Sequence, residues 1–152
     1  MLDHNGYLLS QSGVILHYLQ EKTNQFGPRD EQEKHQILRW ILFDNHKLTS
    51  CIGTLRFIKR FTDQGENEVT AFLEARSKGA LKVLDAHLAQ QKFAVGNQPT
   101  IADISMCGYL FFGDEVGFSL AAYENIGVWL DRIKLLPGWQ HAYDLIPGKP
   151  SA

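Results

Sequence analysis

The sequence predicts an all-α fold, a helical bundle arranged around one buried helix. The tetrapeptide Thr100-Ile-Ala-Asp103 has the form of a capping box, in which the two end residues satisfy each other's backbone N–H groups at a helix start. The segment 104–112 that follows is almost wholly apolar, which is typical of a helix buried on every side. Two stretches with apolar residues at helical spacing, 30–61 and 68–90, are separated only by a short polar turn, as in an antiparallel helix hairpin.

The capping box is interpreted as structural. The first N–H groups of a buried helix meet no water, so they need internal partners. The Asp103 carboxylate also suits the positive end of the helix dipole. A carboxylate in apolar surroundings can instead act as a general acid or base. Because capping accounts for both Thr100 and Asp103, no catalytic role is assigned to either.

The N-terminal segment 1–24 is expected to form one short strand and one helix. The strand is predicted within residues 2–9, and it has no second strand to pair with. Ser12 is the candidate N-cap of a helix over 13–22. One face of that helix is apolar and is expected to pack on the bundle; it contains Val14, Ile15, Tyr18 and Leu19.

The stretch 25–29 contains Gly27-Pro28 and is predicted to be a linker, which divides the chain into the units 1–24 and 30–146. Asp30 is a candidate cap for the long helix that follows, and Gly53 is the position at which this helix is expected to bend. Two further helices are predicted over 125–135, capped by Asn125, and over 139–145. Residues 147–152 are expected to be a frayed tail.

Composition argues against several classes of protein. The 152 residues are 44% hydrophobic and carry a net charge of −2 without a basic stripe, so nucleic acid is not an expected partner. No apolar run approaches the roughly 20 residues of a membrane span. The six histidines lack metal-ligand spacing, so no metal is expected. Cys51 and Cys107 form no CxxC pair and lie in apolar helical patterns, which favours small core residues in a reducing, cytoplasmic compartment.

Three stretches, in this order, resemble the glutathione transferase family. Residues 6–19, with the sequence Gly-Tyr-Leu-Leu-Ser-Gln-Ser-Gly-Val-Ile-Leu-His-Tyr-Leu, resemble the last strand of its thioredoxin-like domain, the Gln/Glu-Ser turn and the next helix. The box at 100–103 resembles the N-capping motif of its all-helical C-terminal domain, and 126–139 resembles the penultimate helix of that domain. The resemblance implies a remnant of the thioredoxin-like glutathione-binding domain at 1–24 and the C-terminal helical domain at 30–146.

The resemblance also implies site residues. Gln11 and Ser12 match the turn that holds the γ-glutamyl end of glutathione, where a helix N-terminus offers free N–H groups to a carboxylate. Spacing alone would favour a simple helix cap for Ser12. The acceptor-substrate pocket is expected to be walled by the first half of the long helix and by an aromatic residue of the buried helix, although aromatic runs on buried helices usually belong to the core. The residues concerned are Arg39, Trp40, Phe43 and Tyr109.

The family's first strand–helix–strand unit, with its thiol-activating Ser, Tyr or Cys and its cis-proline, has no counterpart in this sequence. No catalytic residue is therefore assigned, and residues 1–152 alone are expected to bind glutathione negligibly and to conjugate nothing. Apolar surface left open near Leu8, Leu9, Leu16 and Leu19 is expected to drive formation of a homodimer or larger oligomer.

Three functions remain open. The first is a glutathione S-transferase, in which the thiolate of glutathione, a co-substrate, attacks a small hydrophobic electrophile. The second is a non-catalytic binding or scaffold module, because the same helical domain occurs in translation-factor and synthetase-associated proteins that do no conjugation. The third is a truncated chain with no function of its own.

Overall fold

The computed structural model describes residues 1–117 and 119–146, most of which are helical. Two strands, β1 (Leu2–His4) and β2 (Tyr7–Leu9), precede the helices. The main helices are α1 (Ser12–Thr23), α2 (Glu31–Phe43), α3 (Thr49–Phe61), α4 (Glu68–Leu88), α5 (Ile101–Cys107) and α7 (Glu124–Lys134). Shorter segments are the π-helical turn η1 (Asp44–Leu48), the 3-10 segments η2 (Gly108–Phe112) and η3 (Leu120–Ala122), and the short helices α6 (Gly113–Val116) and α8 (Ala142–Leu145).

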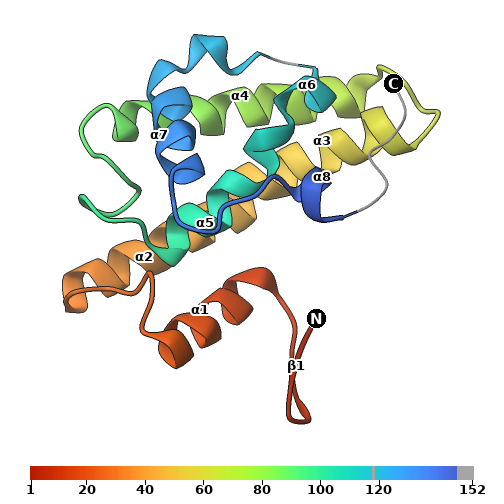
Figure 1. Ribbon diagram of the computed structural model, residues 1–152. Helices are drawn as coiled ribbons and strands as arrows, with labels where there is room; N and C mark the ends of the chain where they lie inside the picture. The colour runs from red at the N-terminus through yellow and green to blue at the C-terminus, as the bar shows by residue number, and fades with distance from the viewer. Residues whose placement is uncertain (118, 147–152) are drawn as a thin grey trace.

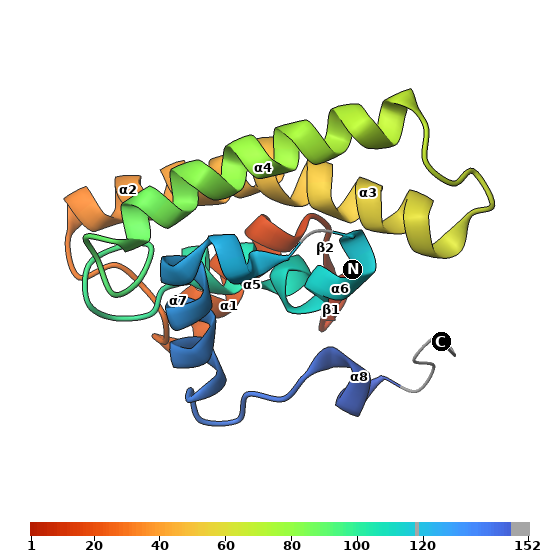
Figure 2. The ribbon, with the colours of Figure 1, turned by 90° about the horizontal axis from the view of Figure 1, so that it is seen from above.

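The helices form a bundle with α5 inside it. Figures 1 and 2 show α4 alongside the rod made by α2 and α3, with α7 packed against α4 at one end. α5 lies against α2 and α1, and α6 lies against α3. The largest fully buried side chains are Trp129, Leu48, Ile52, Leu55, Leu81, Leu84, Met106 and Ile126. The predicted helical bundle is thus confirmed, with a small sheet at the N-terminus.

The N-terminal sheet is a two-stranded antiparallel hairpin that projects from the bundle (Figure 1). Leu2 lies opposite Leu9, and the turn between the strands is made by Asn5 and Gly6, whose φ angles are 55° and 84°. Asn-Gly is the residue pair that favours such a tight hairpin turn. The prediction of a single unpaired strand over 2–9 is wrong, because residues 2–4 supply the partner strand.

α1 differs from prediction in its cap and in its packed face. Its N-cap is Gln11, and Ser12 is already the first helical residue, so the prediction of Ser12 as the cap is wrong. Val14 and Leu19 are 51% and 40% exposed, whereas Leu16 packs against the core. The face turned to the bundle includes Gly13, because a Cβ on Gly13 would lie only 2.9 Å from Cγ2 of Ile41. This close approach, which only glycine permits, rotates Val14 and Leu19 outward.

The stretch 25–29 is tied to the bundle. The carbonyl oxygen of Phe26 accepts a hydrogen bond of 2.9 Å from the backbone N–H of Ile101, the first residue of α5. Phe26 reaches this position with a left-handed φ of 59°, and its side chain packs against the core. One of the free N–H groups at the start of the buried helix is therefore satisfied from the segment predicted to be a linker.

The long helix over 30–61 is interrupted by a π-helical turn. Asp30 caps its start as predicted, accepting the backbone N–H of Glu33 at 2.8 Å. The irregular segment is η1, and Gly53 lies within the regular helix α3, so the expected bend at Gly53 is wrong. Within η1, the buried carboxylate of Asp44 accepts hydrogen bonds from the hydroxyls of Thr49 and Ser105, each at 2.5 Å. These side-chain bonds close the wide turn and connect it to α5.

The later helices follow the predicted order with altered ends. The predicted helix over 101–112 is α-helical only to Cys107 and continues as the 3-10 segment η2. α7 is not capped by Asn125; Asp85 of α4 instead accepts the backbone N–H of Ile126 at 3.1 Å and the side-chain amide of Asn125 at 3.0 Å. The last predicted helix, 139–145, is reduced to α8. The predicted tail over 147–152 lies outside the described residues.

Candidate functional site

The capping box at the start of α5 is confirmed and is part of a larger buried network. The backbone N–H and the hydroxyl of Thr100 both donate to Oδ2 of Asp103, at 2.8 and 3.0 Å. Oδ1 of Asp103 accepts the backbone N–H of Ala94 at 2.7 Å and Nε1–H of Trp129 at 2.8 Å. Burial raises the pKa of Asp103 even though four donors surround it. The carboxylate is 1% exposed, so it holds the loop before α5 and helix α7 in place and reaches no ligand.

The Gln11-Ser12 turn is exposed at the start of α1. Gln11 has φ 68° and ψ 118°, a conformation that costs a non-glycine residue about 1–3 kcal/mol. No side chain caps the helix, and its first backbone bond runs from the N–H of Ile15 to the carbonyl of Gln11 at 3.0 Å. The N–H groups of Ser12, Gly13 and Val14 therefore precede the helical ladder, where they suit an anionic group.

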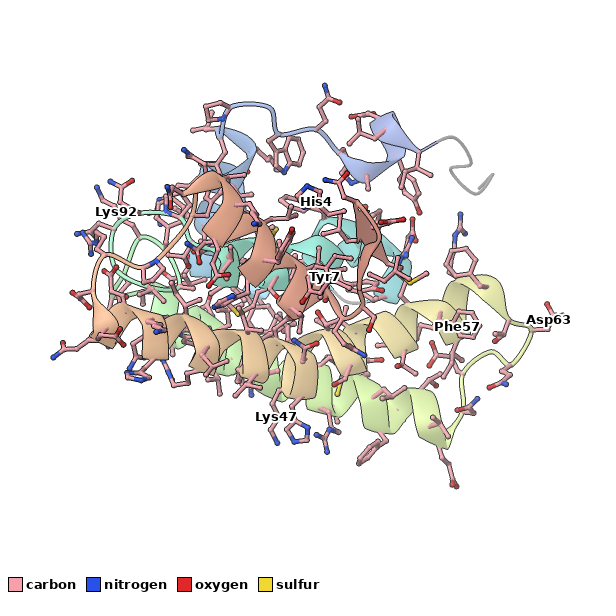
Figure 3. The ribbon with its side chains drawn as sticks, turned by 90° about the horizontal axis from the view of Figure 1, so that it is seen from below. His4, Tyr7, Lys47, Phe57, Asp63 and Lys92 are labelled. Carbon is pink, nitrogen blue, oxygen red and sulfur yellow. The ribbon has the colours of Figure 1, made fainter. Side chains whose placement is uncertain are left out.

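Side chains of the hairpin pack against α1 on the chain-terminal side of this turn. The rings of His4 and Tyr7 each lie 5.8 Å from the ring of Tyr18, and the imidazole of His4 hydrogen-bonds to the Tyr18 hydroxyl. Figure 3 labels His4 and Tyr7 on the hairpin beside α1. The strand before the turn and the helix after it are thus joined by side chains as well as by the chain.

A groove of about 1240 Å³ runs between α1 and α2 and begins at this turn. Its walls include the exposed apolar side chains of α2, Leu38 and Leu42, and those of Tyr7 and Val14 on the facing side. Charges of both signs stand at its rim. The polar and charged lining residues are Gln11, His17, Gln20, Glu21, Arg29, Asp30, Glu31, Lys34, His35 and Asn45.

The four residues predicted for an acceptor pocket do not form one surface. Trp40 is 2% exposed, with its ring 5.1 Å from that of Phe43 and 4.4 Å from that of His87. The guanidinium of Arg39 lies 4.5 Å from the Trp40 ring centre. Tyr109 belongs to η2; its ring lies against Gly53 of α3 and the residue is 36% exposed. The structure therefore places Arg39 and Phe43 against the buried ring of Trp40, and Tyr109 apart from them, on η2.

Three residues after Gly53 on α3, Arg56 forms a polar triad that joins three elements, which sequence reasoning did not connect. Arg56 of α3 donates from Nε to Glu115 and from Nη2 to the hydroxyl of Tyr143, both at 2.7 Å, and that hydroxyl donates to Glu115 at 2.5 Å. Burial acts to raise the pKa of Glu115, but the bonds from Tyr143 and Arg56 outweigh it and hold that pKa below its ordinary value. The bond from Arg56 to Tyr143 joins residues that are 87 positions apart, so no local sequence pattern predicts it.

The two cysteine thiols are buried and are not placed as nucleophiles of a catalytic site. Burial raises the pKa of Cys107 to about 12, so its thiol is protonated and unreactive at neutral pH. Cys51 is buried as well.

Within 1–117 and 119–146, no three His, Cys, Asp or Glu side chains gather as a metal site. In the same part of the chain, none of the helices combines the length and the apolar character of a membrane span.

Comparison with known proteins shows the family. The family profile described as "Glutathione S-transferase, C-terminal domain" matches residues 47–137, more than half of the chain. The chain therefore belongs to the glutathione S-transferase family.

Individual relatives point to two kinds of protein. A glutathione S-transferase structure from Xanthobacter autotrophicus has a TM-score of 0.83 at 27% identity, covering 91% of this chain and 69% of that one. A glutathione transferase from Pseudomonas putida, solved with one glutathione disulfide per subunit, has a TM-score of 0.78 at 27% identity, covering 92% and 63%. Elongation factor 1-gamma-B of Xenopus laevis is 30% identical over 122 residues, which are 74% of this chain and 26% of that protein.

Proposed function

We propose that the chain contributes to glutathione binding in a glutathione S-transferase, with glutathione as the co-substrate and Gln11 and Ser12 holding its γ-glutamyl carboxylate. The observation that supports this most directly is the uncapped start of α1, with its strained Gln11 and its exposed N–H groups. A helix N-terminus favours a carboxylate through both its free donors and its dipole. The Pseudomonas putida relative, solved with glutathione disulfide, supports the same ligand.

The position of Tyr109 supports an acceptor site for a small hydrophobic electrophile. A Cβ on Gly13, beside the turn, would lie 3.7 Å from Nδ2 of Asn45. Gly53 follows Asn45 by eight residues and meets Tyr109, which places Tyr109 at most about 12 Å farther along the helix axis, since the π-helical turn rises less per residue than an α-helix. An extended ligand of two residues covers roughly 7 Å. A glutathione thiol that starts from the turn would therefore approach an acceptor held at Tyr109.

The other predicted wall residues suit that role less well. Trp40 is too buried to touch a ligand in this conformation, and Arg39 and Phe43 pack against it. We assign no catalytic residue within the described residues. One charge-assisted contact is worth about 1.5–3 kcal/mol, whereas a dissociation constant of about 0.1 mM requires roughly 5.5 kcal/mol. Residues 1–152 alone are accordingly expected to bind glutathione weakly and to show no turnover.

The test is an NMR titration of the chain with millimolar glutathione. The amide signals of Ser12, Gly13 and Val14 should shift without saturating, and Ser12→Ala should abolish most of that shift. Ser50→Ala is the matched control, because Ser50 is an exposed helical serine on α3 that does not line the groove beginning at the turn. Unmoved amides at 12–14, or shifts that Ser12→Ala leaves unchanged, would rule out this site.

A second candidate is a non-catalytic binding or scaffold module. The relation to elongation factor 1-gamma-B and the open apolar groove between α1 and α2 favour it. Such a module would keep the groove as its contact surface and would not respond to glutathione. A titration without shifts at 12–14, together with a complex in which Leu38 and Leu42 become protected from solvent, would select this alternative.

A further inference from the structure

The turn of the N-terminal hairpin places an asparagine directly before a glycine on open surface. Asn5 and Gly6 lie between the paired residues His4 and Tyr7, and both are exposed. Nothing lies within 4 Å of a Cβ built on Gly6, so no neighbouring group shields the peptide bond that joins the pair. The amide carbon Cγ of Asn5 and the backbone nitrogen of Gly6 are therefore free to approach each other and close a small ring.

These two groups react with each other without a catalyst. The nitrogen of Gly6 gives up its proton and attacks Cγ of Asn5, the Cγ–Nδ2 bond breaks, and ammonia leaves with that proton. Water then opens the resulting cyclic imide at either carbonyl carbon. One opening gives aspartate in a normal backbone, and the other gives isoaspartate, whose backbone runs through the side chain. A side chain on the following residue hinders the attack, and glycine has none.

In the closed hairpin, Asp3 restrains the attacking nitrogen. The backbone N–H of Gly6 donates to Oδ1 of Asp3 at 2.8 Å, which fixes the direction of that group and engages its proton. The restraint lasts only while the hairpin is closed. A hairpin of two strands is marginally stable in water, and no residue of 1–9 is buried. We therefore expect open hairpins to be populated and the reaction to proceed from them.

We propose that Asn5 is a site of spontaneous deamidation, and that the isoaspartate formed there prevents the hairpin from closing again. Isoaspartate adds a carbon atom to the backbone within a tight turn, so the strands can no longer meet in the register that pairs Leu2 with Leu9. Either product also introduces a new carboxylate into the turn that already contains the carboxylate of Asp3. This inference is independent of the proposed function.

An open hairpin changes the segment that precedes α1. The rings of His4 and Tyr7 both contact the ring of Tyr18 on that helix. These contacts depend on the hairpin, because His4 and Tyr7 face each other across it. Modification of Asn5 should therefore release both rings from α1. The bundle should remain intact, since the residues of its core lie outside the hairpin.

The test is incubation of residues 1–152 at mildly alkaline pH, where the amide nitrogen loses its proton more readily, followed by tryptic peptide mapping with mass spectrometry. Asn5 should convert to aspartate and isoaspartate, and isoaspartate-specific methylation detects the latter. Asn24 is the internal control, because it is also exposed and has a φ of 53°, close to the 55° of Asn5, but is followed by Gln25. Cleavage after Lys22 separates the two asparagines, and Asn24 should stay unmodified.

Two variants test the role of the closed hairpin. Asp3→Ala should speed the conversion of Asn5 about three- to tenfold, because losing one exposed hydrogen bond raises the open population by about that factor. Asp131→Ala, at an exposed aspartate of α7, is the matched control and should leave the rate unchanged. Asn5→Asp carries the new charge in a normal backbone and should keep the hairpin, since Asp-Gly also favours this turn.

Hydrogen exchange then separates the longer backbone from the added charge. The hairpin amides should exchange faster in the isoaspartyl fraction than in Asn5→Asp, while the amides of α4 exchange equally in both. An Asn5 that stays intact, or that converts no faster than Asn24, would overturn the modification site. Unchanged hairpin exchange in the isoaspartyl fraction would overturn the proposed opening. A rate that Asp3→Ala leaves unaltered would overturn the protection by the closed hairpin.

Discussion

The indole N–H of Trp129 donates to Oδ1 of Asp103 over 2.8 Å, although the two residues are 26 positions apart. Both side chains are fully buried, and the same carboxylate also binds the N–H groups of Thr100 and Ala94. A single aspartate thus joins the start of α5, the preceding loop and α7. It is the point at which the helices of the bundle are held in register.

Asp103→Ala should be the most destabilising change in this network. It leaves the buried donors of Ala94, Thr100 and Trp129 without partners, and each unsatisfied group costs about 1–3 kcal/mol. We expect the free energy of unfolding in urea to fall by more than about 3 kcal/mol. Thr100→Ala removes one cap and should cost about 0.5–2 kcal/mol.

The double variant of Thr100 and Asp103 should cost less than the sum of the single changes, since the residues share one motif. Asp131→Ala is the control, because Asp131 is exposed and pairs only with Lys134 on the surface; it should change stability by no more than about 0.5 kcal/mol. If Asp103→Ala has the same free energy of unfolding in urea as the parent, the capping role of Asp103 is contradicted.

Asp44 should make stability depend on pH. Burial raises its pKa in the folded protein above the ordinary aspartate value of the unfolded chain. Between those two values the folded state binds more protons, so stability falls as pH rises through that window. Asp44→Asn retains a side chain that can bond to Thr49 and Ser105 and does not ionise.

The free energy of unfolding of the parent relative to Asp44→Asn should therefore decrease from mildly acidic to neutral pH. Urea denaturation at a series of pH values measures this difference. A difference that grows toward neutral pH would mean that the hydrogen bonds stabilise ionised Asp44 more than burial penalises it.

Tyr143→Phe should loosen the C-terminal end of the described chain. The change removes the hydroxyl through which Arg56 and Glu115 hold α8, while α8 has no buried residue of its own. Hydrogen exchange at the amides of Asp144 and Ile146, which bond within this turn, should become about tenfold faster, the factor expected for the loss of about 1.4 kcal/mol.

Exchange in α4 should not change in Tyr143→Phe, because α8 is not fastened there. Tyr7→Phe tests the loss of a tyrosine hydroxyl on the N-terminal hairpin and should leave the α8 amides unaffected. Equal exchange at Asp144 and Ile146 in parent and variant would show that ring packing alone holds α8.

The groove between α1 and α2 should drive self-association. Leu38 and Leu42 are 54% and 60% exposed on one side of it, and apolar surface of this kind tends to be covered in solution. We expect light scattering to show a dimer or larger species and Leu42→Lys to shift it toward the monomer. Leu135→Lys, at an apolar residue that is 84% exposed away from the groove, should leave the mass unchanged. A monomeric parent would refute this prediction.

The sequence by itself determined the elements whose signals are local. The caps at Asp30 and Thr100 lie within three residues of their partners, and helical spacing of apolar residues located the long helices to within a few positions. The order of three motifs was sufficient to indicate the family. These features could be predicted because a cap or a helical face depends on residues that are neighbours in the chain.

Tertiary structure alone decided the features that depend on distant partners. α7 takes its cap from Asp85 of α4, α1 turns Gly13 toward Ile41, and Tyr109 lies on Gly53. The hairpin was missed because three-residue strands carry too little alternation to be recognised. The contact between Gly53 and the ring of Tyr109 arises only when α3 and η2 pack side by side, because the space beside a glycine is filled by whichever element packs against it.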